Sequence, residues 1–344
     1  MIVGTCRLRA SNHKDVYMKT NRFHSFTMAM LLSLTAGLAT SPAAYAECDE
    51  TVKIAENDWT GNLVDINLLK VILEDELNID AELVFADYTA QWAGLANGDL
   101  DIAMEIWPSF SLDAMQEWID EKKKVVHAGD LGMVGSSGWY VPTYVIKGDE
   151  SRGIEPMAPD LKTWKDIEKY AHLFKRPETG DKIFCIDAIQ SWEIHNEDRI
   201  AALGLNMQNI YAGSEGALMA EIESAYIKGE PLFICDLWRP HWIQGKYDFT
   251  EIELPPYSDE CYGVDGALPG DFGCDFPDEM TFNIARAGFE NECPAAYQLL
   301  ENMWLTAEQQ EKLIVMIDLD GMEPEEAAKA WMAENEDVWR KWLP

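Results

Sequence analysis

Tryptophan is the residue type whose placement in this chain points to chemistry. Trp59 ends the stretch VKIAENDW, Trp107 ends DIAMEIW and Trp238 ends LFICDLW, and each stretch contains the short apolar run that is typical of a strand. Pro108 has no N–H for a strand ladder, so the strand before it ends at Trp107. A core tryptophan normally lies inside an element. These three are instead expected where strands meet loops.

Three more aromatic residues have similar positions. Trp192 follows the apolar run IFCID, and GWYVP contains Trp139 and Tyr140. Aromatic faces attract cations that shed water easily, above all quaternary ammonium groups. A trimethylammonium group has no N–H to donate, so a box of indole faces is the simplest protein site for it. The clustered aromatics therefore predict a binding site for a methylated amine.

The elements that would carry these residues alternate between strand and helix. We expect strands at 51–56, 81–86, 99–107, 181–187, 231–238 and 280–285, and an extended segment at 138–146. Helices are expected at 62–77, 89–98, 161–174, 197–204 and 216–229, and throughout the chain after Ala295. This order predicts an α/β protein with parallel sheets flanked by helices. In such sheets ligands bind beyond the carboxyl ends of the strands, where the tryptophans are expected.

The first 46 residues are predicted to be a secretory signal peptide. Lys19 and Arg22 precede an apolar run from Phe26 to Ala39, and an A-x-A cleavage motif ends at Ala46. Met18 is the expected true start. The alternative is an uncleaved membrane anchor, for which the apolar run is too short. We therefore expect an exported, periplasmic protein.

The net charge of the chain argues against some classes of binding partner. Removing the signal peptide, with five basic residues and one acidic residue, changes the net charge from −34 to −38. Such an acidic surface argues against nucleic acid and anionic membranes as partners.

Six cysteines follow the signal peptide, and their even number in an oxidising compartment favours disulfides. Six cysteines allow fifteen pairings. Cys261 and Cys274 bracket a loop rich in glycine, aspartate and proline, and are the best single candidate for a bridge. No spacing of cysteine and histidine suggests zinc or redox chemistry, and no metal or cofactor is expected. Calcium is a minor alternative for the acidic loop, at Asp259, Asp265, Asp271, Asp275 and Asp278.

Five stretches carry a family resemblance. They are WTGNLVDINLLKVILEDELN, WAGLANGDLDIAMEIWP, GWYVPTYV, YIKGEPLFICDLWRPHW followed by KYDF, and EEAAKAWMAENEDVWRKWL. The chain resembles the substrate-binding proteins of glycine betaine/proline betaine ABC transporters, from residue 50 to 343. The resemblance implies a two-lobed type II periplasmic binding fold with the ligand cleft between the lobes. Lobe 1 would comprise residues 47–145 and 282–344, and lobe 2 residues 146–281, with hinges near Val145 and Thr281.

The resemblance also implies a set of ligand-binding residues. The aromatic cage falls on Trp107, Trp192 and Trp238, with Trp192 in a loop that departs from the family pattern. His241 would bind a ligand carboxylate, and Trp59 and Tyr140 match positions used by choline-type or trimethylamine N-oxide-type relatives. Trp139 is the remaining aromatic candidate. The implied partners are a small methylated amine, an ABC permease and an ATPase at the inner membrane, with the binding protein as a monomer.

Glu105 bears on the choice of ligand. Alternation along AMEIW places Glu105 and Trp107 on the same face of the strand. A carboxylate beside the cage favours choline or an N-oxide, whereas glycine betaine needs donors such as Arg239 or His241. A purely structural role for Glu105 is an equal alternative. We rank glycine betaine first, then choline and trimethylamine N-oxide.

Two other classes compete with a transport receptor. A secreted glycosidase would use paired carboxylates, for which Glu105 and Asp236 are the candidates. A carbohydrate-binding protein would also stack sugars on tryptophan. No nucleophile motif, phosphate-binding loop or zinc motif is present, and a receptor needs none of these.

Overall fold

A computed structural model describes residues 48, 50–264 and 270–344. The predicted signal peptide, residues 1–46, lies outside the described residues. Among the described residues no helix is both long enough and apolar enough to cross a membrane.

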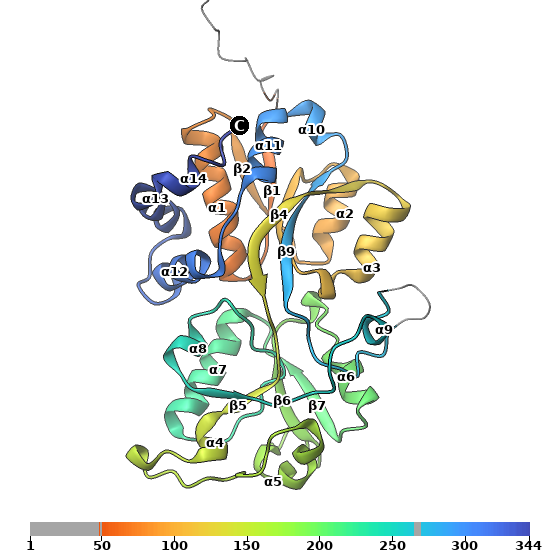
Figure 1. The fold of residues 1–344 in the computed structure, drawn as a ribbon, viewed down its shortest axis with the longest axis vertical. Helices are drawn as coiled ribbons and strands as arrows, with labels where there is room; N and C mark the ends of the chain where they lie inside the picture. The colour runs from red at the N-terminus through yellow and green to blue at the C-terminus, as the bar shows by residue number, and fades with distance from the viewer. Residues whose placement is uncertain (1–47, 49, 265–269) are drawn as a thin grey trace, which may run out of the picture. The chain divides into compact units, whose positions relative to one another are not determined.

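A five-stranded sheet contains the first three predicted strands, in the order β2-β1-β3-β9-β4 (Figure 1). β1 (Val52–Glu56) pairs in parallel with β2 (Ala81–Phe85) and β3 (Ile102–Ile106). β9 (Glu279–Arg286) is antiparallel to both β3 and β4 (Val125–Gly135). The predicted parallel arrangement therefore holds for β1, β2 and β3, and the sheet as a whole is mixed.

Helix α1 (Thr60–Asp75) follows β1 and contributes most of its length to the core. Its apolar side chains, among them Val64, Leu68 and Ile72, are almost completely buried. It packs against α12 (Ala307–Asp318) and α13 (Pro324–Glu334), which come from the far end of the sequence. α1 thus places the residues that follow β1 next to a C-terminal helix.

A second group of strands begins after β4. β6 (Ile183–Asp187) pairs in parallel with β7 (Met207–Tyr211), and β5 (Tyr140–Pro142) pairs antiparallel with β8 (Phe249–Glu251). The predicted strand at 231–238 is not a regular strand. Its Ile234 forms only isolated bridges, to Tyr140 and to Ile186.

Other predictions were wrong in part. Residues 161–174 form a 3-10 helix (Trp164–Tyr170) and then α5 (Ala171–Phe174), and Thr143–Lys147 form helix α4 and not extended chain. β4 was missed because Gly129 and Gly132 interrupt its pattern; both have positive φ, +100° and +93°. β4 has two register shifts against β9 between His127 and Val134.

The remaining helices connect or flank the strands. They are α2 (Ala90–Asn97), α3 (Leu112–Met115), α6 (Asn196–Ala202), α7 (Glu215–Lys228), α8 (Ile243–Lys246), α9 (Asp259–Tyr262), α10 (Phe289–Glu292), α11 (Pro294–Asn302) and α14 (Glu336–Trp339). Short 3-10 turns lie at Pro108–Phe110, Glu150–Arg152 and Gln190–Trp192, and a π-helical turn at Gln116–Glu121.

Candidate functional site

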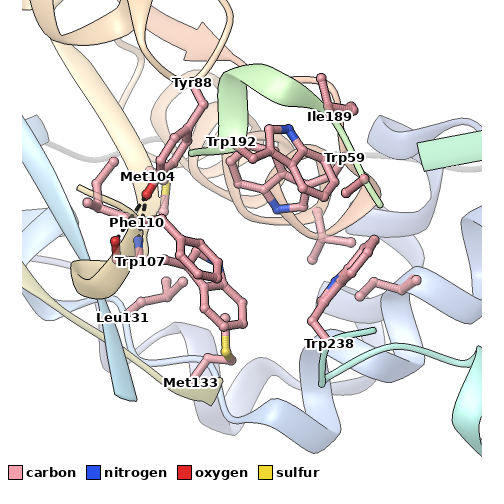
Figure 2. Packing of buried hydrophobic residues seen from close by; sticks show 14 of the residues in the cluster. Trp59, Tyr88, Met104, Trp107, Phe110, Leu131, Met133, Ile189, Trp192 and Trp238 are labelled. Carbon is pink, nitrogen blue, oxygen red and sulfur yellow. Dashed lines mark hydrogen bonds between the residues drawn. The ribbon is translucent and has the colours of Figure 1, made fainter. Parts of the chain in front are cut away.

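One cavity is lined almost entirely by aromatic side chains and acids. The centre of a water-sized sphere can occupy about 30 Å³ within this cavity. Figure 2 shows Trp107 and Phe110 on one side, with Trp59, Trp192 and Trp238 on the other. The complete lining is Trp59, Tyr88, Glu105, Trp107, Phe110, Trp192, Asp236 and Trp238.

Strand ends bring several of these residues together. Trp59 follows β1, Tyr88 follows β2 and Trp107 directly follows β3. Because these three strands are parallel neighbours, their carboxyl ends meet at one edge of the sheet. Trp192 ends the 3-10 turn after β6, and Trp238 ends the bridged segment beside it.

The walls of the cavity are aromatic rings set edge to face. The Trp59 and Trp192 rings lie 5.5 Å apart at 74°, and the Trp192 and Trp238 rings lie 5.3 Å apart at 83°. Trp107 stacks on Phe110 with ring centroids 5.7 Å apart. Perpendicular indoles present their faces in different directions, which is what enclosing a compact cation requires.

Glu105 fixes two of the four indoles. The Nε1–H of Trp59 donates to Glu105 Oε2 at 2.9 Å, and that of Trp107 donates to Glu105 Oε1 at 3.2 Å. Glu105 has a φ of +59°, and the pairing of β3 with β9 shifts register between Ala103 and Ile106. A non-glycine residue seldom takes this left-handed conformation. This irregularity directs the carboxyl group toward both tryptophans.

Two further contacts hold tryptophans in place. The Trp192 Nε1–H donates to Asp58 Oδ1 at 2.8 Å. Gly135 on β4 leaves room for Trp107, since a Cβ at this glycine would lie 2.3 Å from the indole ring.

Both acids of the lining are buried, and burial disfavours their ionised forms. Burial raises the pKa of Glu105 to about 7, against the hydrogen bonds from Trp59 and Trp107 that lower it. Burial, and next the charge of Asp187, raise the pKa of Asp236 well above its usual value. The Ser137 hydroxyl donates to Asp236 and opposes this rise. The cavity can therefore offer a protonated carboxyl group close to neutral pH.

Three predicted ligand residues do not line the cavity. Trp139 is fully buried and donates its Nε1–H to Asn196 Oδ1 at 2.8 Å, and Tyr140 belongs to β5. His241 packs beside Trp238, with ring centroids 5.1 Å apart. Its Nδ1 accepts the N–H of Ile243 at 3.1 Å, which directs the ring into the protein.

Two lining residues were missed by the sequence reasoning. Tyr88 comes three residues after β2, at the same sheet edge as Trp59, and its hydroxyl accepts the backbone N–H of Trp107 at 2.8 Å. Phe110 is the last residue of the short turn after Trp107. The rule that selected tryptophans after strands, applied to all aromatics, would have found both.

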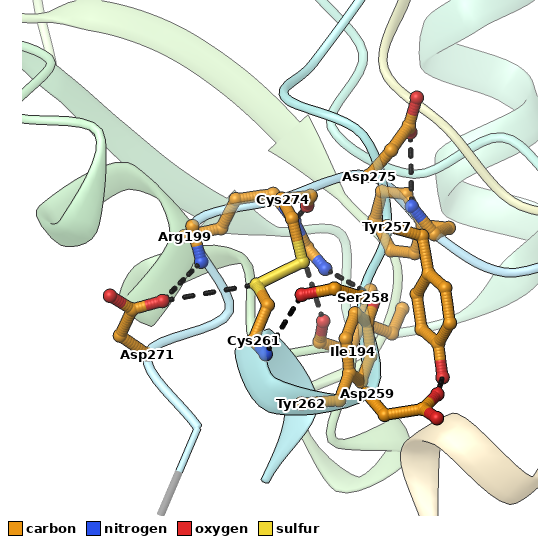
Figure 3. The surroundings of a disulfide bond; sticks show 12 residues. Ile194, Arg199, Tyr257, Ser258, Asp259, Cys261, Tyr262, Asp271, Cys274 and Asp275 are labelled. Carbon is orange, nitrogen blue, oxygen red and sulfur yellow. Dashed lines mark hydrogen bonds between the residues drawn. A yellow bond between two sulfur atoms is a disulfide. The ribbon is translucent and has the colours of Figure 1, made fainter. Parts of the chain in front are cut away.

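Three disulfides join the six cysteines. Cys261–Cys274 closes the loop of the best sequence candidate (Figure 3). Cys48–Cys293 and Cys185–Cys235 are the other bridges. Cys185 lies on β6 and Cys235 precedes Asp236, so this bridge ties together the two segments that lead to Trp192 and Trp238.

The acidic loop shows no metal cluster among its described members; Asp265 lies outside them. Asp259 accepts the hydroxyl of Tyr257, Asp271 accepts the N–H of Gly273, and Asp275 accepts the N–H of Phe276. In the described part of the chain one other group, Glu215, His241 and Asp318, has three ligand atoms within 4.8 Å of one another. Because Nδ1 of His241 accepts a hydrogen bond, Nε2 carries the proton and is a donor, which does not fit a metal ligand.

Comparison with known proteins bears directly on this geometry. A family model described as the substrate binding domain of ABC-type glycine betaine transport systems matches residues 50–334. The chain belongs to this family. Its members bind substrates for transport and are not known as enzymes.

Individual relatives fit within this family. A trimethylamine N-oxide-binding protein of Pelagibacter ubique (strain HTCC1062) is 28% identical over 323 residues, covering 91% of this chain and 98% of the relative. The glycine betaine/carnitine transport binding protein GbuC of Listeria monocytogenes is 29% identical over 133 residues, covering 39% of this chain and 38% of the relative.

Solved structures show the same fold at low sequence identity. A glycine betaine/L-proline-binding protein from Borrelia burgdorferi superposes with a TM-score of 0.68 at 21% identity, covering 86% of this chain and 97% of that one. An ABC-transporter choline-binding protein in complex with choline gives 0.66 at 18% identity, covering 85% and 91%. The predicted fold class, a periplasmic substrate-binding protein of α/β type, is confirmed.

Proposed function

We propose that this member of the family captures trimethylamine N-oxide in the tryptophan-lined cavity and delivers it to an ABC permease. The observation that carries the proposal is the composition of the lining: four indoles, two buried carboxyl groups and, among the described residues, no basic side chain. The indole faces suit the methylated nitrogen. A protonated Glu105 suits the N-oxide oxygen, which accepts a hydrogen bond.

The carboxylate of glycine betaine fits this lining less well. It would lie against Glu105 and Asp236, and the donors proposed for it point elsewhere. Arg239 donates to Gln244 at 2.6 Å, and His241 faces Glu215. The lining therefore favours the N-oxide over glycine betaine, the ligand ranked first from sequence.

A relative supports the same ligand. The Pelagibacter ubique trimethylamine N-oxide-binding protein aligns over nearly its whole length with this chain. Choline is the second candidate, because an ionised Glu105 would attract its positive charge. The protonation state of Glu105 thus decides between trimethylamine N-oxide and choline.

The pH dependence of binding tests this proposal. An N-oxide raises the pKa of Glu105 in the complex above its value of about 7, so its affinity is complete below that pH and is lost above it. The dissociation constant measured by calorimetry should rise about tenfold per pH unit above neutrality. Choline lowers the pKa of Glu105 in the complex, so its affinity should fall as the pH drops below 7. Glycine betaine binding more tightly than both ligands would contradict the proposal.

We also propose a location, an oligomeric state, partners and lobe boundaries for the protein. The protein would work in the periplasm as a monomer after removal of the signal peptide, and with a membrane permease and its ATPase. Its lobes would be residues 47–145 with 282–344, and residues 146–281. We place the hinges near Val145 and Thr281, close to where the chain passes from β4 to β5 and returns into β9.

A further inference from the structure

Asp65 lies behind Glu105 and does not line the cavity. It is on α1 and is completely buried, as is the Glu105 carboxyl group, within 2% exposure. The side-chain amide of Gln310 on α12 joins the two, donating to Asp65 Oδ2 at 3.1 Å and to Glu105 Oε2 at 3.2 Å. The two carboxyl groups therefore share one amide donor, and each changes the pKa of the other. They therefore form a buried pair of acids.

Such a pair cannot carry two negative charges at neutral pH. Among the described residues no lysine, arginine or histidine forms an ion pair with either acid. Like charges in contact, with no counter-ion, force one of two buried carboxyl groups to keep a proton. The question is which of them keeps it.

The hydrogen bonds of the pair are unequal. Glu105 accepts three N–H groups, from Trp59, Trp107 and Gln310. Within the described part of the chain, Asp65 accepts only the Gln310 amide, and its Oδ1 accepts no hydrogen bond. Donors stabilise the ionised form of a carboxyl group. The negative charge of the pair is therefore better placed on Glu105, and the proton on Asp65.

The other acids around Glu105 do not change this placement of the charge on Glu105 and the proton on Asp65. Glu215 on α7 is a like charge that disfavours ionised Glu105. Asp236 across the cavity has its own pKa raised well above its usual value, and the Tyr88 hydroxyl is a neutral neighbour. Burial, and next the charge of Glu105, raise the pKa of Asp65 well above its usual value.

We propose that Asp65 is a positioning residue that stays un-ionised, donates its hydroxyl to Glu105, and thereby sets the pH at which the cavity changes from accepting an N-oxide to accepting a cationic ammonium. Ionised Glu105 favours the cation and protonated Glu105 favours the N-oxide, so a residue that touches no ligand controls the choice. The choice of ligands rests on the proposed function, while the effect of Asp65 on Glu105 does not.

Two variants distinguish an un-ionised Asp65 that donates to Glu105 from an ionised Asp65. In Asp65→Ala, Glu105 loses a donor to its ionised form, so its titration should move up by about one pH unit. In Asp65→Asn, the amide can donate in place of the hydroxyl, so the titration should stay near that of the wild type. If Asp65 were instead ionised, both variants would remove a neighbouring negative charge and move the titration down.

The titration can be followed without any ligand. Trp59 and Trp107 donate to Glu105, so their fluorescence should change as Glu105 gains a proton. Glu105→Gln should abolish that transition. Glu279 also has a pKa raised to about 7 by burial and contacts Ser109 near Trp107, so Glu279→Gln serves as the control that leaves the transition in place.

Calorimetry with trimethylamine N-oxide and with choline then completes the test. In Asp65→Ala the pH at which N-oxide affinity begins to fall should rise with the fluorescence midpoint, and in Asp65→Asn neither should move. A downward shift in either variant, or an unchanged midpoint in Asp65→Ala, overturns the role of Asp65. If the midpoints move as expected but neither ligand binds wild type, the proposed function fails and the Asp65–Glu105 relation stands.

Discussion

At the scale of single residues, Glu105 does more than line the cavity. Its two oxygens hold the indoles of Trp59 and Trp107, so the same carboxyl group orients two walls and faces the ligand space. Since these indole N–H groups are satisfied by Glu105, their faces remain available for a methylated nitrogen. The aromatic walls and the acid act as one unit.

Truncation of the tryptophans tests their contribution. Trp107→Ala and Trp238→Ala should each weaken binding of trimethylamine N-oxide by about 1–2 kcal/mol, the range for a desolvated cation–π contact. The dissociation constants are measured by calorimetry, after thermal melts show that each variant folds. Trp304→Ala is the matched control, because Trp304 is half exposed and lies outside the cavity lining. Wild-type affinity in either cavity variant would remove that residue from the site.

At the scale of elements, the site depends on where strands stop and on what packs behind them. β4 ends at Gly135, and the missing side chain there makes room for the Trp107 ring. The position of Trp107 is therefore set by a neighbouring strand and not only by the one it follows.

Gly135→Ala should displace Trp107 and weaken binding of the N-oxide at least about tenfold, because the new methyl group would overlap the ring. Gly216→Ala is the control, since a Cβ at Gly216 meets nothing within 4 Å. Calorimetric dissociation constants of the two variants provide the comparison. Equal, wild-type-like affinities would show that Trp107 moves aside without cost.

Much of this arrangement could be predicted from the sequence. Glu105 turns toward the tryptophans through its left-handed backbone and not through strand alternation, and Trp238 follows a segment that is not a regular strand. The positions of Trp59, Trp107 and Trp192 followed from strands that end at loops. Such local patterns depend on residues close in the chain. They predicted β1, β2, β3 and β6 for the same reason.

The parts of the site that could not be predicted from the sequence depend on contacts between residues far apart in the chain. His241 was expected to bind a ligand carboxylate; it does not line the cavity, and its Nδ1 accepts the N–H of Ile243. Asp65 and Gln310, separated by 245 residues, meet Glu105 only because α1 packs against α12. No local pattern contains that information.

At the scale of the whole molecule, the residues that line the cavity come from two parts of the fold. Glu105, Trp107 and Trp59 come from the ends of strands in the five-stranded sheet, and Trp192 and Trp238 come from the second group of strands. The family to which the chain belongs consists of substrate-binding proteins of transporters, which bind and then release a small molecule. A site built from both groups of strands suits a receptor that opens and closes around its ligand.

A crystal structure of the mature protein, residues 47–344, grown with trimethylamine N-oxide at about pH 6 tests the central claim most directly. The methyl groups should lie against the indoles of Trp59, Trp107, Trp192 and Trp238, with the N-oxide oxygen in hydrogen-bond contact with Glu105. A ligand bound elsewhere, or one whose oxygen points away from Glu105, would contradict it.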